Sequence, residues 1–563
     1  MAVTSRPITS LHQRSRVAPW LNHYPEAVPF SLEYPQIPAW GYLERTAADY
    51  GDRVACHYYN QRMTYGELYA NARKMAHVLV KLGVKPGDRV GVLLPNTPEM
   101  LIALNGIWMA GAVVVAVSPL MVTAEVSALL KTTQCKTVIA LDLLLPQLFD
   151  GEYQPDLVLL TTISDRLPLV QKLGYSAARI ARLGIRSKAR DKRCRSFSKE
   201  LVQGSAIFQP IQQGSIDDPA FILPTGGTTA APKAVVLSHR NLVSNAWQLH
   251  HWGGATMAEE TVLAVVPFFH SYGLTTCAMT GTAMAATLVL QHRFVPRRVL
   301  RAIETVRPTV FHAVPAMLCQ LNKLMRNSKR DHTSINYCMS GGAPLPAIVA
   351  EEFAQHTGAI VVEGYGLSEA SPVTHAGPLD GTARPGTISL PLPDTEVRVV
   401  DPDTGYRPVG PGEVGEITVR GPQVMLGYWN DPEGTSRAIR DGWLYTGDLA
   451  VCDEDGLFRI VDRKKDLIIT SGFNVYPSDV ERVIKGFPGI EDAAVIGVPD
   501  AERGEVVKVV LILERNHKFD RKEFMNQCKA HLAKHKRPRL IEIADGDLPR
   551  NFLGKVLRKD LRT

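Results

Sequence analysis

Apolar residues recur along most of the chain in two alternating patterns. Between about residue 50 and residue 400, stretches with helical spacing, such as 65–81, are followed by short apolar runs, such as 88–94. Apolar residues three to four positions apart indicate a helix with one buried face, whereas short continuous runs indicate strands buried on both faces. This alternation predicts an α/β fold built from layered, largely parallel sheets.

One stretch, Leu101 to Val117, is apolar enough to be considered as a membrane span. Thr97 is suited to cap a helix here, and Pro98 suits its first turn. Gly111 can end that helix, and the run 112–117 (AVVVAV) then predicts a buried strand. We therefore interpret the stretch as a helix and a strand of a doubly wound unit, not as a membrane span.

The pattern changes near residue 413. Residues 413–420 (EVGEITVR) alternate like a half-exposed strand, and residues 456–461 indicate another. A charged break at 462–466 (DRKKD) follows, and a smaller unit lies beyond it.

The smaller unit has the pattern of an α+β fold. Ser478 and Glu481 have capping-box spacing before one helix, and Asp520 and Glu523 repeat that spacing before another. Residues 505–513 predict a strand between the two helices. The chain is therefore expected to have four parts: an N-terminal arm (1–40), a large domain (41–461), a hinge (462–466) and a small mobile C-terminal domain (467–563).

The composition is that of a soluble globular protein. Of 563 residues, 45% are hydrophobic and 21% are charged, and this length implies two or more domains. The eight cysteines are scattered without a CxxC pair or a Cys/His cluster, which argues against a zinc site and a disulfide framework. Residues 1–25 lack a continuous apolar core, so no signal peptide is indicated, and a poorly ordered arm is favoured over a transit peptide. We expect a cytoplasmic protein.

Basic residues are concentrated in one segment. The formal net charge is +7, but residues 166–199 contain eleven Lys/Arg and one Asp, or +10, which leaves 7 − 10 = −3 for the rest. This distribution argues against a general nucleic-acid-binding surface. Five residues of the segment fall at helical spacing, namely Leu169, Leu173, Ala177, Ile180 and Gly184. Two interpretations stay open: a cationic helix resting on anionic lipid at the inner face of a membrane, and a solvated insertion.

A loop rich in glycine and threonine lies between two short apolar runs. Residues 221–223 lead into 224–233 (PTGGTTAAPK), and 235–237 resume a strand. Small residues let backbone N–H groups surround a phosphate, threonine hydroxyls add donors, and lysine adds charge. It is not a Walker loop, because GxxxxGK[ST] is absent and a strand follows, and on its own it fits a surface hairpin equally well. The candidate phosphate-binding residues are Thr225, Gly226, Gly227, Thr228, Thr229 and Lys233.

This loop resembles the signature of the acyl-adenylate-forming, or AMP-binding, superfamily, which is roughly TSGTTGxPKG. The superfamily includes acyl-CoA synthetases, luciferases and adenylation domains of peptide synthetases. Here Gly226 stands in place of a serine, and Ala230 and Ala234 replace two glycines. Alanine tolerates a positive φ poorly, so the loop is expected to be stiffer or differently shaped. Further resembling motifs follow in the family's order, and the resemblance covers nearly the whole chain after residue 40.

The next motifs imply contacts with the acid, the adenine and the metal. Residues 267–273 (PFFHSYG) resemble PxFHxxG, which implies that His270 lies beside the acid substrate. Residues 340–344 (SGGAP) imply that Gly341, Gly342 and Ala343 pass close to the adenine and the acyl chain. On its own, His270 would more often be a buried core histidine.

Residues 363–369 (EGYGLSE) resemble the family's YGxTE element, with a serine in place of the threonine. The resemblance implies that Tyr365 stacks on adenine, that Ser368 binds a phosphate and that Glu369 supplies an oxygen ligand to Mg²⁺. The flanking glycines, Gly364 and Gly366, are included in this nucleotide site. A lone glutamate would more often be a solvated surface charge.

The last motifs imply ribose binding, a hinge and a catalytic lysine. Residues 445–448 (YTGD) resemble the ribose-binding element, in which Asp448 and Arg463 reach the hydroxyls. Lys465 matches the hinge position, and Gly472 belongs to a loop (SGFN) that lines the pantetheine tunnel in the thioester-forming state. Residues 548–558 (LPRNFLGKVLR) resemble PRTxxGKxxR, in which Lys555 matches the catalytic lysine.

Taken together, the resemblance implies an ATP-dependent acyl-CoA synthetase that uses ATP, Mg²⁺ and coenzyme A. A medium- or long-chain fatty acid is favoured by likeness to long-chain synthetases, including the arm 20–25 (WLNHYP), although Leu274 stands where some relatives have an aromatic gate. The alternatives are a fatty-acyl-AMP ligase that loads a carrier protein, an aryl-acid–CoA ligase, and a non-catalytic nucleotide- or acyl-binding relative.

Overall fold

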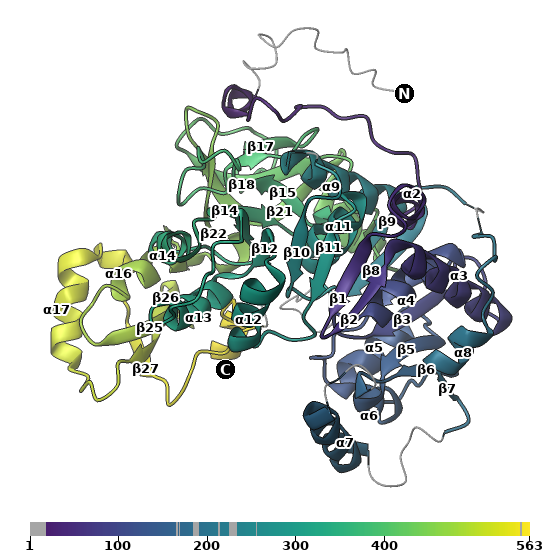
Figure 1. Ribbon diagram of the computed structural model, residues 1–563. Helices are drawn as coiled ribbons and strands as arrows, with labels where there is room; N and C mark the ends of the chain where they lie inside the picture. Colours follow the sequence, from purple (N-terminus) through teal and green to yellow (C-terminus); the bar gives the residue numbers. More distant parts are fainter. Residues whose placement is uncertain are drawn as a thin grey trace.

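The structure is a computed structural model that describes residues 18–164, 167, 169–183, 191–211, 214–224, 233–254, 256–500, 502–551 and 554–562. The chain forms a large lobe and a small lobe, and the small lobe is the yellow end of the chain in Figure 1. Each lobe has its own hydrophobic core, and the two cores lie on either side of residues 462–466 in sequence. The placement of the domain boundary at those residues stays a prediction.

The first sheet of the large lobe is mostly parallel, as the alternating pattern predicts. Its strands, from edge to edge, are β19 (Gly427–Tyr428), β9 (Ala234–Ser238), β8 (Pro219–Pro224), β4 (Val113–Ala116), β3 (Arg89–Leu93), β5 (Thr137–Leu141), β6 (Leu157–Thr161) and β7 (Cys194–Ser196). The strands from β8 to β7 pair in parallel, whereas β9 and β19 are antiparallel to their neighbours.

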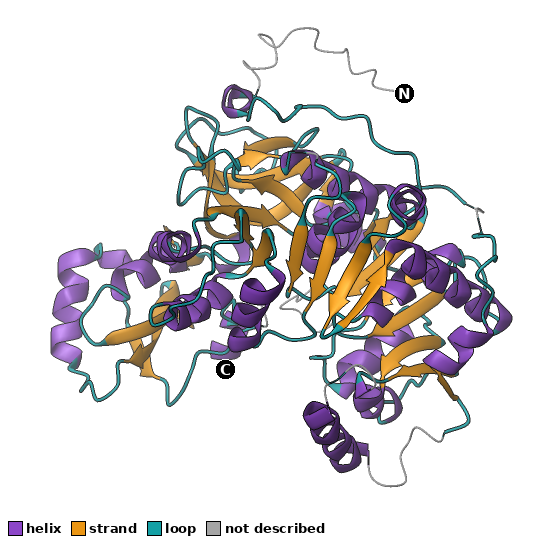
Figure 2. Cartoon of the chain, viewed as in Figure 1, coloured by secondary structure: helices purple, strands orange, loops and turns teal. Residues whose placement is uncertain are grey.

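A second, nine-stranded sheet lies beside the first (Figure 2). Its order is β16 (Leu390–Pro391), β15 (Val373–Ala376), β14 (Ile360–Gly366), β13 (Tyr337–Ser340), β12 (Val310–Ala313), β10 (Thr261–Ala264), β11 (Thr287–Leu290), β1 (Val54–Tyr58) and β2 (Gln61–Thr64). The six strands from β14 to β1 are parallel, and the three edge strands are antiparallel. Parallel strands bring their carboxyl ends to one edge of the sheet, which is where ligands bind in open α/β folds.

Helices connect the strands and cover the sheets (Figure 2). Thr64 caps α3 in a capping box, because its hydroxyl accepts from the N–H of Glu67 and its own N–H donates to the Glu67 carboxylate. The α-helices of the large lobe are α2 (Gly41–Asp49), α3 (Tyr65–Lys81), α4 (Pro98–Met109), α5 (Thr123–Thr132), α6 (Leu145–Phe149), α7 (Leu169–Leu183), α8 (Phe197–Gln203), α9 (His239–Trp252), α10 (Ser271–Gly273), α11 (Thr280–Ala283), α12 (Pro296–Val306), α13 (Pro315–Met325), α14 (Ala347–Thr357) and α15 (Pro432–Ala438). A π-helix, η5 (Leu274–Met279), joins α10 to α11, and short 3₁₀ turns are η1 (Pro19–His23), η2 (Asp142–Leu144), η6 (Ser368–Ala370) and η7 (Lys464–Asp466).

The apolar stretch 101–117 is a buried helix and strand, as predicted. α4 is buried on nearly every side, and Gly111, with φ +71°, makes the turn into β4. Thr97 takes the N-cap position, but its side chain makes no capping hydrogen bond, so that detail of the prediction is wrong. Within the described ranges, no helix has both the length and the apolarity to cross a membrane.

A third sheet, entirely antiparallel, completes the large lobe. It contains β17 (Glu396–Val400), β18 (Val414–Arg420), β21 (Trp443–Cys452), β20 (Ile439–Arg440) and β22 (Phe458–Arg463). The predicted strands at 413–420 and 456–461 correspond to β18 and β22, which confirms them within two residues. β22 leads directly into the hinge.

The small lobe is an α+β unit, as predicted. Its strands are β23 (Ile468–Thr470), β24 (Phe473–Val475), β25 (Ile490–Asp500), β26 (Gly504–Leu513) and β27 (Leu540–Ile543), and its helical segments are α16 (Pro477–Ile484), α17 (Arg521–His531), η8 (Lys534–Lys536) and η9 (Arg558–Leu561). Asp520 caps α17 by accepting from the N–H groups of Lys522 and Glu523. The capping box at Ser478 and Glu481 is wrong, because α16 already begins at Pro477 and Glu481 instead pairs with Arg558.

Candidate functional site

A polar cluster forms where the antiparallel sheet of the large lobe meets the hinge. The side chain of Asp448, on β21, is 7% exposed, and its two oxygens contact two different partners. Oδ2 accepts a hydrogen bond of 2.7 Å from the Tyr365 hydroxyl, and Oδ1 lies 2.8 Å from Nε of Arg463. The Asp448 charge raises the pKa of Arg463, so the guanidinium stays charged. A carboxylate held in this way is a ready acceptor for neighbouring hydroxyls.

The backbone explains why these residues meet. Asp448 on β21 is the register partner of Arg463 on β22, so their side chains share one face of the sheet. Tyr365 comes from β14, near the carboxyl end of the parallel strands. The sequence predicted that Asp448 and Arg463 act together, but the direct bond from Tyr365 to Asp448 was not predicted.

Lys555 belongs to a closed loop at the end of the chain. The N–H of Lys555 donates to Oδ1 of Asn551 at 2.9 Å, and the N–H of Asn551 donates to the Lys555 carbonyl at 2.9 Å. Gly554 has φ +82°, and a Cβ there would lie 3.3 Å from Ala316 at the start of α13. The glycine therefore lets the loop of the small lobe approach the large lobe closely.

The surroundings of Lys555 favour its neutral form more than water does. Burial lowers its pKa to about 8, and the positive charge of Arg463 acts in the same direction, while Asp448 and Asp466 oppose the shift. Because the charges of Asp448 and Arg463 act on Lys555, the terminal loop lies near the polar cluster of the large lobe. Lys555, Asp448, Arg463 and Tyr365 thus form one site.

The lowered pKa predicts a pH dependence for any reaction that needs the Lys555 ammonium group. Below about pH 8 the group is protonated in the free enzyme, and above it the protonated fraction falls about tenfold per pH unit. We therefore expect kcat/KM for adenylate formation to be level below pH 8 and to decline above it. A Lys555→Arg variant, whose guanidinium stays charged, should be less active but without that decline; a decline that persists in it would assign the ionisation to another group.

Glu369 lies in a second cluster, near the predicted phosphate loop. Its Oε1 accepts a hydrogen bond of 3.0 Å from the Tyr428 hydroxyl, and Nζ of Lys233 lies 4.4 Å from the centroid of the Tyr428 ring. Tyr428 was not predicted from the sequence, because it is 59 residues from Glu369 and reaches it only through the pairing of β19 with β9. Ser368, in η6, adjoins Glu369.

The rest of the predicted phosphate loop lies outside the described residues: Thr225, Gly226, Gly227, Thr228 and Thr229. Of the two alanines that replace family glycines, Ala230 is also outside them. Ala234 is the first residue of β9 and pairs with Pro224, and its N–H and C=O belong to an extended strand. Alanine is suited to an extended strand, so the expected distortion does not apply at this position.

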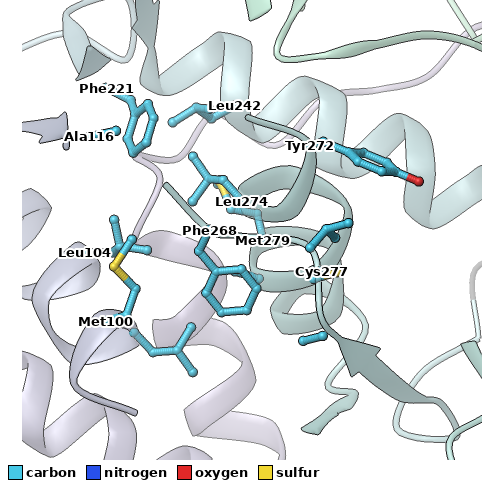
Figure 3. Packing of buried hydrophobic residues seen from close by; sticks show 14 of the residues in the cluster. Met100, Leu104, Ala116, Phe221, Leu242, Phe268, Tyr272, Leu274, Cys277 and Met279 are labelled. Atoms are coloured by element: carbon cyan, nitrogen blue, oxygen red, sulfur yellow. The ribbon is translucent and has the colours of Figure 1, made fainter. Parts of the chain in front are cut away.

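His270 is half-buried at the carboxyl side of β10. Burial lowers its pKa to about 4, so the ring is neutral, and Nδ1 accepts from the N–H of Tyr272 at 3.1 Å. The Tyr272 hydroxyl donates to the carbonyl of Met339 at 2.9 Å, which ties this segment to β13. Behind it, apolar side chains of α4 and η5 pack together, among them Met100, Leu104, Leu274 and Met279 (Figure 3).

The predicted glycines pack closely against this segment and the next strand. A Cβ on Gly341 would lie 3.1 Å from the Tyr272 ring, and a Cβ on Gly366 would lie 1.9 Å from the Pro372 carbonyl. A Cβ on Gly364 would meet the flexible side chain of Met339, and Gly342 has φ +83°. The requirement for glycine is therefore strongest at Gly366 and Gly342. Ala343 follows them in the same loop.

Glu363 also lies in this region and was not singled out from the sequence. Glu363 precedes Gly364 on β14, a strand of the parallel sheet. Burial raises the pKa of its carboxyl to about 7. A half-buried carboxyl with a raised pKa, in a strand of a parallel sheet, is typical of binding sites. Its burial depends on tertiary packing, which the local sequence does not reveal.

Near the end of the chain, Arg558 forms ion pairs with residues of the hinge. Arg558 lies 3.0 Å from Glu481 of the small lobe, 3.3 Å from Asp466 and 3.6 Å from Asp462. The N–H of Ser478 also donates to Asp462 at 2.8 Å. These contacts surround Lys465, whose pKa is lowered by burial and by Arg463. A rotation at Lys465 would have to break the bonds to Asp462.

Gly472 is not part of the cluster in this arrangement of the lobes. It forms the turn between β23 and β24 with φ +81°, and a Cβ there would have no described atom within 4 Å. The neighbouring Phe473 is 56% exposed and stacks on the His535 ring at 4.9 Å. The predicted role of Gly472 therefore requires a second arrangement of the lobes.

Comparison with known proteins gives consistent matches over most of the chain. Residues 43–429 match the family described as AMP-binding enzyme, and residues 479–555 match the AMP-binding enzyme C-terminal domain. A long-chain-fatty-acid–CoA ligase of Bacillus subtilis is 37% identical over 96% of this chain and 97% of its own length. ATP-bound MatB of Rhodopseudomonas palustris superposes with a TM-score of 0.78, at 30% identity, over 93% of this chain and 98% of its own. The apo form of the same MatB covers the same shares but has a TM-score of 0.68.

Proposed function

Because the chain belongs to the AMP-binding enzyme family, we propose that it is an ATP-dependent acyl-CoA synthetase that joins a medium- or long-chain fatty acid to coenzyme A. The observation that carries this proposal is the single site formed by Lys555 of the small lobe with Asp448 and Arg463 of the large lobe. The full-length similarity to long-chain-fatty-acid–CoA ligases supports the choice of acid. The enzyme acts in the cytoplasm.

In the first half-reaction, an oxygen of the fatty carboxylate attacks the α-phosphorus of ATP and pyrophosphate leaves. Both reactants are anionic and repel each other. The Lys555 ammonium lies between them and stabilises the charge that develops in the transition state. Asp448 accepts hydrogen bonds from the ribose hydroxyls, which fixes the nucleotide relative to Lys555. Neutral His270 borders the carboxylate without adding a charge.

The donor set fits a Mg²⁺ ion that arrives with ATP. Glu369 offers one half-buried carboxylate beside Tyr428 and Lys233, and no group of three or more His, Cys, Asp or Glu residues suited to a metal occurs among the described residues. Mg²⁺ typically takes one or two protein carboxylates and completes its shell with phosphates and water. When bound, it neutralises charge on the leaving pyrophosphate. Lys233 and the loop 225–229 hold the same phosphates.

In the second half-reaction, the pantetheine thiolate attacks the acyl carbon, and AMP leaves. The thiol needs the space that the Lys555 ammonium occupies, so one rigid site cannot serve both steps. The small lobe therefore rotates about Lys465, which withdraws Lys555 and brings Gly472 to the pantetheine. The better superposition on ATP-bound than on apo MatB supports assigning the present arrangement to the first half-reaction.

The π-helix η5, which follows His270 in sequence, is buried among apolar side chains, as a site for an apolar acid requires. A small cavity of about 20 Å³ lies between α4 and η5 and is lined by Leu101, Leu104, Leu274, Ala278 and Met279 among others. That volume holds no more than a water molecule, so an alkyl chain would have to displace these side chains. The π-helix η5 contains three of the lining residues, and π-helical turns are frequent at functional sites.

Acid-dependent ATP–pyrophosphate exchange, measured over saturated acids of increasing chain length and an aryl acid such as benzoate, tests this proposal. We expect exchange with medium- or long-chain acids, and thioester formation when free coenzyme A is added. Strong preference for benzoate would indicate an aryl-acid ligase. Exchange with thioester formation only on a carrier protein would indicate an acyl-AMP ligase. No exchange with any acid would indicate a binding protein.

A further inference from the structure

One buried side chain joins the two mostly parallel sheets of the large lobe at the ends of their strands. Asn96 follows β3 of the first sheet and precedes α4, and it is 2% exposed. The segment that it contacts, 264–268, begins at the last residue of β10 in the second sheet. Ligands of open α/β folds bind at the carboxyl ends of the strands. Asn96 therefore lies where a ligand site is expected.

Three hydrogen bonds attach Asn96 to this segment. Its Nδ2 donates to the carbonyls of Ala264 at 3.2 Å and of Val266 at 2.9 Å. Its Oδ1 accepts from the N–H of Phe268 at 2.8 Å. The side-chain amide thus uses both of its N–H groups and its oxygen on backbone groups of the other sheet. An aspartate of nearly the same shape could accept from Phe268 but could not donate to either carbonyl.

The attached segment leads directly to His270. The N–H of His270 donates to the carbonyl of Pro267 at 3.1 Å, so the backbone turns immediately after the residues that Asn96 holds. This turn sets where the His270 ring lies. A shift of the segment would move the ring, although Asn96 itself contacts only backbone atoms before it.

The same segment reaches the apolar interior. The Phe268 ring is fully buried in the cluster that includes Met100 of α4 and Leu274 of η5 (Figure 3). An alkyl chain that entered between α4 and η5 would displace apolar side chains of this cluster. The hydrogen bonds of Asn96 join the start of α4 to the backbone of 264–268, and they do not depend on how those apolar side chains are arranged.

We propose that Asn96 is a positioning residue of the acid site, which holds 264–268 so that His270 borders the carboxylate of the fatty acid. Asn96 does not touch the substrate. This inference rests on the proposed function, because it takes the acid to lie beside His270. Since Asn96 acts at the carboxylate end of the acid, its effect should not depend on the length of the alkyl chain.

ATP–pyrophosphate exchange by Asn96→Asp, measured with laurate and with palmitate, tests this role. We expect KM for each acid to rise at least about tenfold, and by a similar factor for both, because two buried carbonyls lose their donor. KM for ATP should stay within about twofold of the wild type. A purely structural role would lower the melting temperature and the active fraction, which reduces kcat without changing either KM.

The matched control is Asn241→Asp. Asn241 is also buried, and its side chain makes the same three kinds of bond, to the carbonyls of Pro422 and Val424 and from the N–H of Ser238, at 2.8–2.9 Å. This variant should lose a similar amount of thermal stability without a rise in KM for the acids. Asn96→Ala removes all three bonds of Asn96 without burying a charge, so it replaces Asn96→Asp if that variant does not fold.

Three results would overturn the role of Asn96. They are an unchanged KM for the acids in a folded Asn96 variant, a rise for one acid only, and an equal rise in Asn241→Asp. No exchange by the wild-type enzyme with either acid would refute the proposed function and this role with it. Normal wild-type exchange with an unchanged KM in the variants would refute only the role of Asn96.

Discussion

Replacing Lys555 with alanine should lower the rate of acyl-adenylate formation by about a hundred- to a thousandfold, which corresponds to about 2.7–4 kcal/mol of lost transition-state stabilisation. The ammonium is expected to act only while carboxylate and α-phosphate react. Thioester formation from supplied acyl-AMP and coenzyme A should therefore stay within a few-fold of the wild type. ATP–pyrophosphate exchange measures the first step, and acyl-CoA formed from synthetic acyl-AMP measures the second.

Two companion variants make this result interpretable. Lys559→Ala removes an exposed lysine four residues further along the same tail and should leave both half-reactions unchanged. Gly472→Asn should do the opposite of Lys555→Ala, because asparagine tolerates the φ of +81° and its side chain has no described neighbour in the present arrangement but would obstruct pantetheine after rotation. Equal losses of both half-reactions in Lys555→Ala would contradict the assigned role.

The second large effect is expected for Asp448→Asn. This change keeps the volume of the side chain but removes the charge that pairs with Arg463 and that would accept from the ribose hydroxyls. A hydrogen bond to a charged group contributes about 1.5–3 kcal/mol, so kcat/KM for ATP should fall about ten- to a hundredfold or more. Steady-state kinetics with varied ATP, at saturating acid, gives this value.

Glu416→Gln provides the matched control for Asp448→Asn. Glu416 is also a buried carboxylate of the antiparallel sheet, and it pairs with Lys464 at 2.8 Å and accepts from the N–H of Gly447. Removing the charge of Glu416 should lower the melting temperature about as much as Asp448→Asn does. It should not change KM for ATP to a comparable extent. If the two variants impaired ATP binding equally, the effect of Asp448 would be structural and the ribose role would be wrong.

Much of the fold could be predicted from the sequence because the helices and strands follow from the local spacing of apolar and polar residues. Buried runs such as 112–117 predicted strands of the parallel sheets, and the change of pattern near residue 413 predicted two strands, β18 and β22, of the antiparallel sheet. Where two local signals competed, the prediction was less accurate. Pro477 at the first helical position starts α16 one residue before Ser478, so the capping box inferred there does not form.

The contacts within the site were harder to predict because they join distant segments. The motifs identified Asp448, Arg463 and Lys555 individually, but the bond from Tyr365 to Asp448 spans 83 residues and follows from packing. Tyr428 and half-buried Glu363 were missed for the same reason. The helical spacing in 166–199 correctly predicted α7, whereas the bond from Tyr175 to Asp142 joins segments 33 residues apart and was not predicted.

A crystal structure with a non-hydrolysable acyl-adenylate analogue would test most directly whether the terminal lysine bridges the two reactants. We expect the Lys555 ammonium within hydrogen-bond distance of the oxygen that links the acyl group to the nucleotide, with the ribose hydroxyls on Asp448 and the lobes arranged as described above. An analogue bound with its ribose at Asp448 in that arrangement, but with the Lys555 side chain directed away from the linkage, would contradict it.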